Sequence, residues 1–303
     1  MVKIFGAGVY NIREYGCDGV FNNMSVYKYD ITKELVYKTV DSSLKMPMAK
    51  MERDMIVKAF SLYKKVTYFN AKTVRLENIE DQNEKSIIKL SLIDFFDFLV
   101  INIVSLQLDD FIQYIKSNDM YHDLHDVINR LKHYCMEMRK VDDFKTLIYR
   151  GMSSNALAVS VLLSDDNGDY LLTQRSKKVG ISEKFHSVSA TGTVDEVDYC
   201  SADPLKNCVV RELHEELNIH VNNENLQMHS IVAGKNKLQP IVIINGRIEG
   251  IFSELLNRAN EAKDFTYEVD KLCIANRELL KTILTNNKFT EAVEYHIKTV
   301  AEL

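Results

Sequence analysis

The sequence predicts an α/β protein built from two parts. The second part (151–303) is expected to form an α/β/α sandwich with a mixed sheet, and the first part (1–150) a mixed, helix-rich α+β domain. Strand-like and helix-like hydrophobic patterns alternate along the second part, as such a sandwich requires. In the first part the pattern is mainly helical after Glu84. Between the two parts lies Gly151–Asn155, a stretch of mostly small residues that predicts a domain boundary.

Composition is typical of a soluble globular protein. The 303 residues suffice for two domains, with 46% apolar and 27% charged residues. The formal charge of −5 gives no general attraction to nucleic acid or to an anionic membrane, so we expect neither as a partner. The five cysteines are odd in number and form no CxxC pair, which favours reduced thiols in a cytoplasmic protein.

Two stretches bear on membrane association. The first residues lack the long apolar stretch of a signal peptide. The most apolar run, Ile87–Leu108, is long enough to span a bilayer, but Lys, Asp, Asn and Gln residues interrupt it. Charged side chains are costly inside a bilayer, so this run predicts a buried helix and no membrane span.

The first part carries no motif whose chemistry we can name. His122 and His125 stand three residues apart beside Asp126, a spacing that could bind a metal on a helix. No second Cys or His pair follows at the spacing of a metal site, so we expect a solvated or core-edge role. The predicted elements are a strand over Val2–Val9, extended structure over Ser25–Val40, a helix over Pro47–Lys65, a strand over Thr67–Leu76 and helices from Glu84 to Tyr149.

The second part opens with a nearly continuous apolar run, Ala156–Leu163, which is typical of a strand buried on both faces. The turn signal Asp165–Gly168 follows, and Tyr170–Gln174 is expected to return as the hairpin partner. Further predicted elements are strands over Asn225–Val232, Pro240–Ile244 and Val269–Ala275, and helices over Phe252–Lys263, Asn276–Leu284 and Thr290–Ala301.

A further helix is predicted from Pro204 to Leu217. Asp203 is a good N-cap, and proline suits the first helical position because the missing N–H would have no partner there. Asn218 can adopt the left-handed conformation that ends a helix.

Three carboxylates lie close together on this helix. Glu212, Glu215 and Glu216 are three or four residues apart or adjacent, so all three project from one side and repel one another. Arg211 can reach Glu215, but one arginine does not neutralise three acids. A divalent cation with a preference for oxygen ligands, Mg²⁺ or Mn²⁺, is the natural counter-charge. The plain alternative is a charged, solvated helix face.

The surroundings of these acids resemble the box of the Nudix hydrolases, which reads Gly, five residues, Glu, seven residues, then Arg-Glu-apolar-x-Glu-Glu-x-Gly-apolar. Here Arg211–Ile219 reads Arg-Glu-Leu-His-Glu-Glu-Leu-Asn-Ile, and Gly192 is followed after five residues by Asp198. Upstream, Asp169–Ser176 and His186–Gly192 look like the two strands that lead into the box. The resemblance covers about the second half of the chain.

Three departures from the Nudix pattern are visible. The first Glu is Asp198, the closing Gly is Asn218, and the gap Tyr199–Val210 holds twelve residues where the family has seven. The longer gap contains the helix cap and the proline, so extra loop before the helix explains it. Asparagine at the closing position keeps the left-handed option that glycine offers.

The resemblance implies an enzyme that hydrolyses a nucleoside diphosphate linked to another group, with Mg²⁺ or Mn²⁺ as cofactor. It implies Glu212, Glu215 and Glu216 as metal ligands, and one of these or Glu268 as the group that positions or deprotonates water. Arg211 would orient a box carboxylate. The expected partner is a small nucleotide substrate, and the first part could select that substrate, bind a partner or form a homodimer.

Two further residues belong to the predicted site. Gly192 would let the backbone approach closely where a side chain would collide. Arg175 could form a surface ion pair or clamp a phosphate, because the guanidinium fork matches phosphate oxygens. Glu249 and Glu254 compete with Glu268 for the role of an extra carboxylate outside the box.

Other functions stay open. A domain that resembles a Nudix hydrolase can act as a ligand sensor without catalysis, with the first part as an effector or partner-binding module. An isopentenyl-diphosphate isomerase resembles the same fold, but its chemistry needs a cysteine in the strand before the box, and His186–Ala190 has none. A structural or interaction protein with solvated acids would bind no metal at all.

Overall fold

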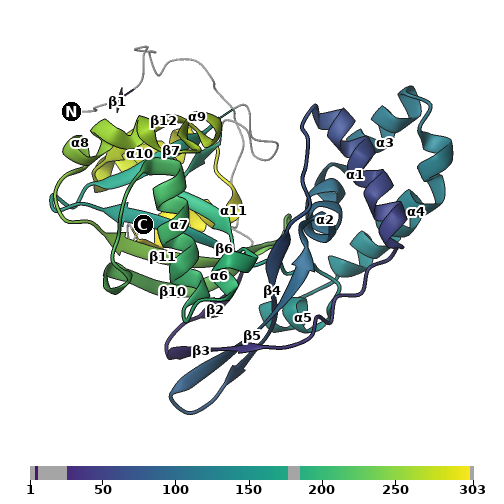
Figure 1. Ribbon diagram of the computed structural model, residues 1–303, viewed down its shortest axis with the longest axis horizontal. Helices are drawn as coiled ribbons and strands as arrows, with labels where there is room; N and C mark the ends of the chain where they lie inside the picture. The colour runs from purple at the N-terminus through teal and green to yellow at the C-terminus, as the bar shows by residue number, and fades with distance from the viewer. Residues whose placement is uncertain (1–3, 6–25, 177–184, 301–303) are drawn as a thin grey trace.

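The computed structural model describes residues 4–5, 26–176 and 185–300 and shows an α/β protein with two mixed sheets (Figure 1). The predicted α/β class is confirmed. Of the predicted strand Val2–Val9, only Ile4–Phe5 lies within the described residues. Cys17 lies outside them, and the other four cysteines are free thiols. Within the described ranges, no helix has both the length and the apolar character that crossing a bilayer requires.

The large sheet has the strand order β1-β12-β7-β6-β11-β10-β2, with β8 paired to β7 and β9 paired to β6. The sheet is mixed because β11 runs parallel to β6, whereas the other pairs are antiparallel. Its strands are β1 (Ile4–Phe5), β2 (Val26–Asp30), β6 (Ala158–Ser164), β7 (Tyr170–Arg175), β8 (His186–Ser187), β9 (Ala190–Thr193), β10 (Leu226–Gly234), β11 (Pro240–Arg247) and β12 (Val269–Ala275).

Helices cover both faces of this sheet. Successive side chains of β6 point to opposite faces, so Val159 and Val161 join a core with α7, while Leu162 joins a core with α10 and α11. Figure 1 shows α7 lying across one face of the sheet. The helices of this part are α6 (Glu196–Tyr199), α7 (Pro204–Leu217), α8 (Phe252–Leu255), α9 (Phe265–Glu268), α10 (Arg277–Asn286), α11 (Glu291–Val300) and the 3₁₀ turns Asn223–Asn225 and Leu256–Glu261.

The hairpin expected after β6 is split by two short strands. β6 and β7 pair only at Ser164 and Tyr170, and then diverge so that β9 pairs with β6 and β8 pairs with β7. The Ser189 hydroxyl joins the diverging strands, because it accepts from the Leu163 amide at 2.8 Å and donates to the Leu171 carbonyl at 2.7 Å. The segment before the acidic helix is thereby placed between the two strands.

The smaller sheet belongs to the first part and has the order β3-β5-β4, with strands β3 (Glu34–Thr39), β4 (Lys72–Asp81) and β5 (Lys85–Asp94). The helical prediction from Glu84 is therefore wrong as far as Asp94. β5 is buried along most of its length between β3 and β4, and a short run rich in Ile and Leu does not reveal by its period whether it is helix or strand. The helices of this part are α1 (Lys50–Lys64), α2 (Phe95–Phe98), the π-helix η1 (Leu99–Ile103), the 3₁₀ turn Val104–Gln107, α3 (Leu108–Ser117), α4 (Tyr121–Met138) and α5 (Phe144–Tyr149).

Strands from both sides of residue 150 share the large sheet. β2 pairs with β10 and β1 pairs with β12, so the first part supplies both edges. The two parts also meet at β4, where the Val74 amide donates to the Val194 carbonyl at 2.8 Å and the Val74 carbonyl accepts from the Leu157 amide at 2.8 Å. The division of the chain at residue 150 into two folding units stays a prediction, but the sheets do not divide there.

A buried ion pair strengthens this junction. The Arg75 guanidinium, whose side chain is fully buried, contacts the Glu77 carboxylate at 2.6 Å and donates to the Ser153 carbonyl at 3.2 Å. Glu77 also accepts from the hydroxyls of Ser43 and Ser91. Each charge therefore has partners, as a buried pair requires. The small-residue boundary is accordingly a packed connection.

Candidate functional site

The acidic helix α7 has the termini that its sequence predicts. The Asp203 side chain accepts from the Lys206 amide at 3.2 Å, and Pro204 is the first helical residue. Asn218 ends the helix in the left-handed conformation, with φ of 54°. Val209 and Leu213 on one side of the helix are fully buried against the sheet. This packing fixes which residues face the end of β9.

Arg211 holds several acids together. Its guanidinium contacts Asp198 at 2.8 Å, Glu212 at 2.7 Å and Glu215 at 3.1 Å, and donates to the Thr193 carbonyl at 3.2 Å. The side chain is largely buried, so solvent screens these contacts less than it would at the surface. The predicted orienting role of Arg211 is therefore compatible with its position, and stays a prediction.

Asp198 lies on α6 and is fully buried beneath Arg211. Besides the two bonds from Arg211, its carboxylate accepts from the Asn207 amide group at 3.0 Å and from the Asp195 backbone amide at 3.0 Å. The contacts of this shorter acid with Asn207 and Arg211 tie α6 to α7, while the bond from Asp195 caps α6. The additional residues between Asp198 and Arg211 form the end of α6 and the turn that carries the cap of α7.

Gly192 leaves the space that Glu212 occupies. A Cβ atom built on Gly192 would lie 2.0 Å from the carboxyl carbon of Glu212 and 2.1 Å from one of its oxygens. Real atoms cannot approach so closely, so any larger residue at this position would displace the carboxylate. The close approach expected at Gly192 is therefore present, and the group that approaches is a predicted metal ligand.

Three acids share one desolvated region. Burial raises the pKa of Glu212 to about 7, against the opposing charge of Arg211. Burial and the neighbouring Glu212 raise the pKa of Glu216 well above its usual value, and Glu268 adds to the rise. Burial also raises the pKa of Glu268. We call Glu212, Glu216 and Glu268 the acidic cluster. Glu212 and Glu268 both disfavour the charged form of Glu216, an arrangement that a bound cation would relieve.

Arg175 borders the acidic cluster at the end of β7. It contacts the Glu268 carboxylate at 3.3 Å and donates to the Thr191 hydroxyl at 3.4 Å, and its charge opposes the rise in the pKa of Glu216. Its Nε–H is buried and has no hydrogen-bond partner in the part of the chain that the structure describes. Arg175 thus forms an ion pair and also keeps an unused donor.

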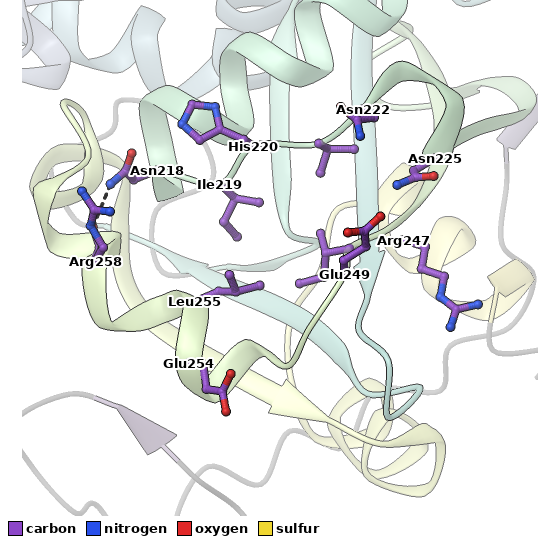
Figure 2. A pocket seen from close by; sticks show the side chains of 12 residues that line it. Asn218, Ile219, His220, Asn222, Asn225, Arg247, Glu249, Glu254, Leu255 and Arg258 are labelled. Atoms are coloured by element: carbon purple, nitrogen blue, oxygen red, sulfur yellow. Dashed lines mark hydrogen bonds between the residues drawn. The ribbon is translucent and has the colours of Figure 1, made fainter.

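Two of the other predicted acids, Glu249 and Glu254, lie apart from this cluster, whereas Glu215 borders it and contributes to the raised pKa of Glu212. Glu215, a predicted metal ligand, is paired with Arg211 and, at 3.4 Å, with Lys263. Glu249 and Glu254 line a cavity of about 370 Å³ near the C-terminal end of α7, and no member of the acidic cluster lines it (Figure 2). Of the three rivals for an extra carboxylate, the structure therefore places Glu268 with the box acids.

The donor set can be tested for its fit to a metal. Three carboxylates whose pKa values are raised by burial offer the oxygen donors that Mg²⁺ and Mn²⁺ prefer. However, within residues 26–176 and 185–300, no three acidic, His or Cys side chains are already arranged around one metal position. Glu212 in particular is bonded to Arg211. The donors fit by their chemistry, and binding would require their side chains to turn inward.

One cation near the site has no signal in the sequence. Lys237 lies in the turn between β10 and β11, where a lysine normally suggests only a solvated surface. The structure brings it near Arg175, whose charge contributes to lowering the pKa of Lys237. Only the fold reveals this proximity, because β7 and the β10–β11 turn are distant in sequence.

Comparison with known proteins gives a limited result. No family model matches the chain, and no curated protein matches it. Among solved structures, the chain is similar to DR0079 from Deinococcus radiodurans, with 14% identity, 48% of this chain and 82% of that chain covered, and a TM-score of 0.35. It is also similar to a MutT protein from Methanosarcina mazei Go1, with 14% identity, 49% and 96% coverage, and a TM-score of 0.34. Similarity at this level does not establish an activity.

Proposed function

We propose that this protein is a metal-dependent hydrolase that cleaves the phosphoanhydride bond of a nucleoside diphosphate linked to another group. The observation that carries the proposal is the acidic cluster, in which Glu212, Glu216 and Glu268 are desolvated together and Gly192 leaves room only for the Glu212 carboxylate. A purely structural role offers no reason to bury three like charges at one place. The resemblance of Arg211–Ile219 to the Nudix box supplies the reaction class.

The residues divide into two groups under this proposal. Glu212, Glu216 and Glu268 would hold Mg²⁺ or Mn²⁺, which when bound neutralises phosphate oxygens and lowers the pKa of water. Glu268 would also accept a proton from an attacking water, and the rise of its pKa on burial supports this role. Arg211 keeps the box acids oriented from behind, with Asp198 and Glu215 as its own counter-charges.

Arg175 contributes a different interaction. Its unused Nε–H and its position beside Glu268 allow it to donate to a phosphate oxygen as charge develops in the reaction. Replacing a phosphate clamp by a neutral residue would weaken substrate binding and lower the rate. The surface ion pair that is the plain alternative does exist, but it uses only part of the guanidinium.

The proposal is tested by product chromatography on a panel of nucleoside-diphosphate compounds with magnesium and with manganese. We expect metal-dependent turnover of at least one compound, with kcat at least about 100-fold lower in Glu216→Gln, because a transition-state electrostatic contact is lost. The same variant should melt no lower than the wild type, since it removes a buried charge from a repulsive site. Glu249→Gln, outside the acidic cluster, is the matched control and should retain full turnover.

A ligand sensor is the second candidate, and one observation favours it. Arg211 already neutralises Glu212, and in the described ranges no three donors surround a metal position. A sensor would bind a compound of the panel without converting it, and its affinity would be the same in Glu216→Gln. That pair of results would overturn the hydrolase proposal.

A further inference from the structure

Lys237 and Arg175 lie where strands of the large sheet end on the same side, near the beginning of β6. In β6 the residue Ala158 pairs with Ile241 of β11 on one side and with Thr193 of β9 on the other, so the β10–β11 turn projects beside the end of β9. The Lys237 side chain is half-buried, and its ammonium lies 5.4 Å from the centre of the Phe98 ring of α2. A residue of the first part thus forms a wall for this lysine.

The backbone of the turn is fixed by the first part and by the segment that joins the two parts. The Asn102 amide group donates to the Lys237 carbonyl at 2.8 Å, and the Ser153 hydroxyl donates to the Leu238 carbonyl at 3.1 Å. Asn102 is itself held, because its side-chain carbonyl accepts from the Ser154 hydroxyl at 2.5 Å. It belongs to the π-helix η1, a geometry that is rare and often occurs at functional sites. Figure 1 places α2, which leads into η1, on the side of the helical part that faces the large sheet.

The charge of Lys237 has no protein counterpart in the described chain. Over residues 26–176 and 185–300, no ion pair joins it to a carboxylate. Desolvation and the charge of Arg175 together lower its pKa to about 7, which shows that the surroundings disfavour the ammonium as they stand. Lys237 and Arg175 are therefore two neighbouring cations in a desolvated place, and Arg175 keeps an unused Nε–H donor. A bound anion would neutralise their repulsion and accept hydrogen bonds from both.

Arg175 also connects this cation pair to the acidic cluster. It contacts Glu268, and its charge acts on Glu216 at one side and on Lys237 at the other. A ligand that carries two linked phosphates could therefore face the acidic cluster through a metal ion and reach Lys237 with its second phosphate.

We propose that Lys237 and Arg175 together bind one phosphate of the diphosphate substrate, and that Phe98 and Asn102 position Lys237 for this contact. The inference rests on the proposed function for the nature of the ligand. It gives the first part of the chain a role in substrate binding, because the residues that hold Lys237 come from α2 and η1. Lys237 is a binding residue here, while Phe98 and Asn102 act only through it.

The test measures binding of methylenediphosphonate, a diphosphate analogue with a carbon bridge that cannot be hydrolysed, by calorimetry in the presence of magnesium. We expect Lys237→Gln to weaken binding about tenfold or more, since a charge-assisted hydrogen bond is lost. Lys237→Arg should retain most of the affinity. Lys235→Gln is the matched control, because it removes the same charge from the same turn at an exposed side chain that lies over Tyr27.

The positioning residues give a second measurement. Phe98→Leu should weaken binding less than Lys237→Gln, and it should have no effect in a chain that already carries Lys237→Gln. Thermal melting verifies that each variant is folded, and Lys237→Met, which keeps the apolar stem against Phe98, replaces the glutamine variant if that one melts early.

The outcomes separate this inference from the proposed function. If Lys237→Gln binds the analogue as tightly as the wild type and Lys235→Gln, the inference is overturned. If the panel shows no turnover but binding still depends on Lys237, the hydrolase proposal fails and this inference stands. If turnover occurs and Lys237→Gln leaves binding unchanged, the hydrolase proposal stands and this inference fails.

Discussion

Two sets of buried polar side chains lie on opposite faces of the large sheet. They differ in whether their members carry charges that lack partners. On the face covered by α7, Gly192 pairs with Val159 and leaves room for the acidic cluster. One residue further along β6, on the face covered by α11, the Ser160 hydroxyl contacts His296 Nδ1 at 2.8 Å, and His296 Nε2 contacts the Asn245 side-chain oxygen at 3.2 Å.

The second group is satisfied without charge. His296 is fully buried, and burial lowers its pKa to about 3, so the ring is neutral and both of its nitrogens have neutral partners. A serine, a histidine and an asparagine in a row could suggest nucleophilic catalysis, but the serine and the histidine are fully buried. The acidic cluster is the opposite case: its charges have too few partners. The comparison teaches that an unbalanced buried charge, more than a familiar set of residue types, marks the site.

At neutral pH, the largest loss of stability is expected at Asp198, the fully buried counter-charge of Arg211. Asp198→Asn keeps the shape but leaves the buried Arg211 without its fully buried counter-charge, which should cost about 2 kcal/mol in the free energy of unfolding. Urea unfolding at neutral pH measures this. Glu261→Gln, which breaks an exposed ion pair with Arg258, is the control and should cost less than about 0.5 kcal/mol. Equal losses in the two variants would show that Arg211 does not depend on Asp198.

Two glycines sharpen the comparison between site and core. In Gly192→Ala the new methyl group displaces the Glu212 carboxylate, so kcat/KM on the active compound of the panel should fall about tenfold while the melting temperature changes little. In Gly246→Ala the methyl group would lie 2.5 Å from a Leu163 methyl in the core, which should destabilise the fold by about 1–3 kcal/mol and leave kcat/KM of the folded enzyme unchanged. If both variants lose stability and neither loses kcat/KM, Gly192 has no role in the site.

Close to neutral pH the smallest effect is that of His296, and it grows as the pH falls. The pKa of His296 falls from 6.5 to about 3 on folding. Between these two pH values the ring is therefore protonated in the unfolded chain and neutral in the folded chain. Stability should therefore fall by about 1.4 kcal/mol for each pH unit below 6.5, until about pH 3. His296→Gln can make both contacts and should lack this part of the loss, measured as the difference from wild type in urea unfolding over that range. His220→Gln, at an exposed ring, should show the full loss.

Local signals explain what the sequence predicts well. The limits of α7 follow from Asp203, Pro204 and Asn218, because a capping side chain, a proline and a left-handed residue act within one turn. β12 begins and ends at the predicted residues, Val269–Ala275. The grouping of Glu212 with Glu216 follows directly from helical spacing.

Contacts between distant segments explain what was not predicted. β5 resembles a helix in its composition, and only its position between β3 and β4 makes it a strand. The second counter-charge of Glu215, Lys263, comes from a segment distant in sequence. Lys237 acquires its surroundings from Phe98, Asn102 and Arg175, which lie on three other elements. No local pattern reports such an arrangement.

The pairing of β2 with β10 has a consequence for how the chain reaches its native state. Asp30 lies opposite Ser230, so the whole chain between the two strands must be synthesised before their hydrogen bonds can form. Contacts so distant in sequence form slowly. Until β2 arrives, β10 is an open edge with unpaired amides and carbonyls, which can pair with the same edge of another copy. A chain shortened from its beginning past Asp30 would keep every acid of the site and yet be prone to aggregate.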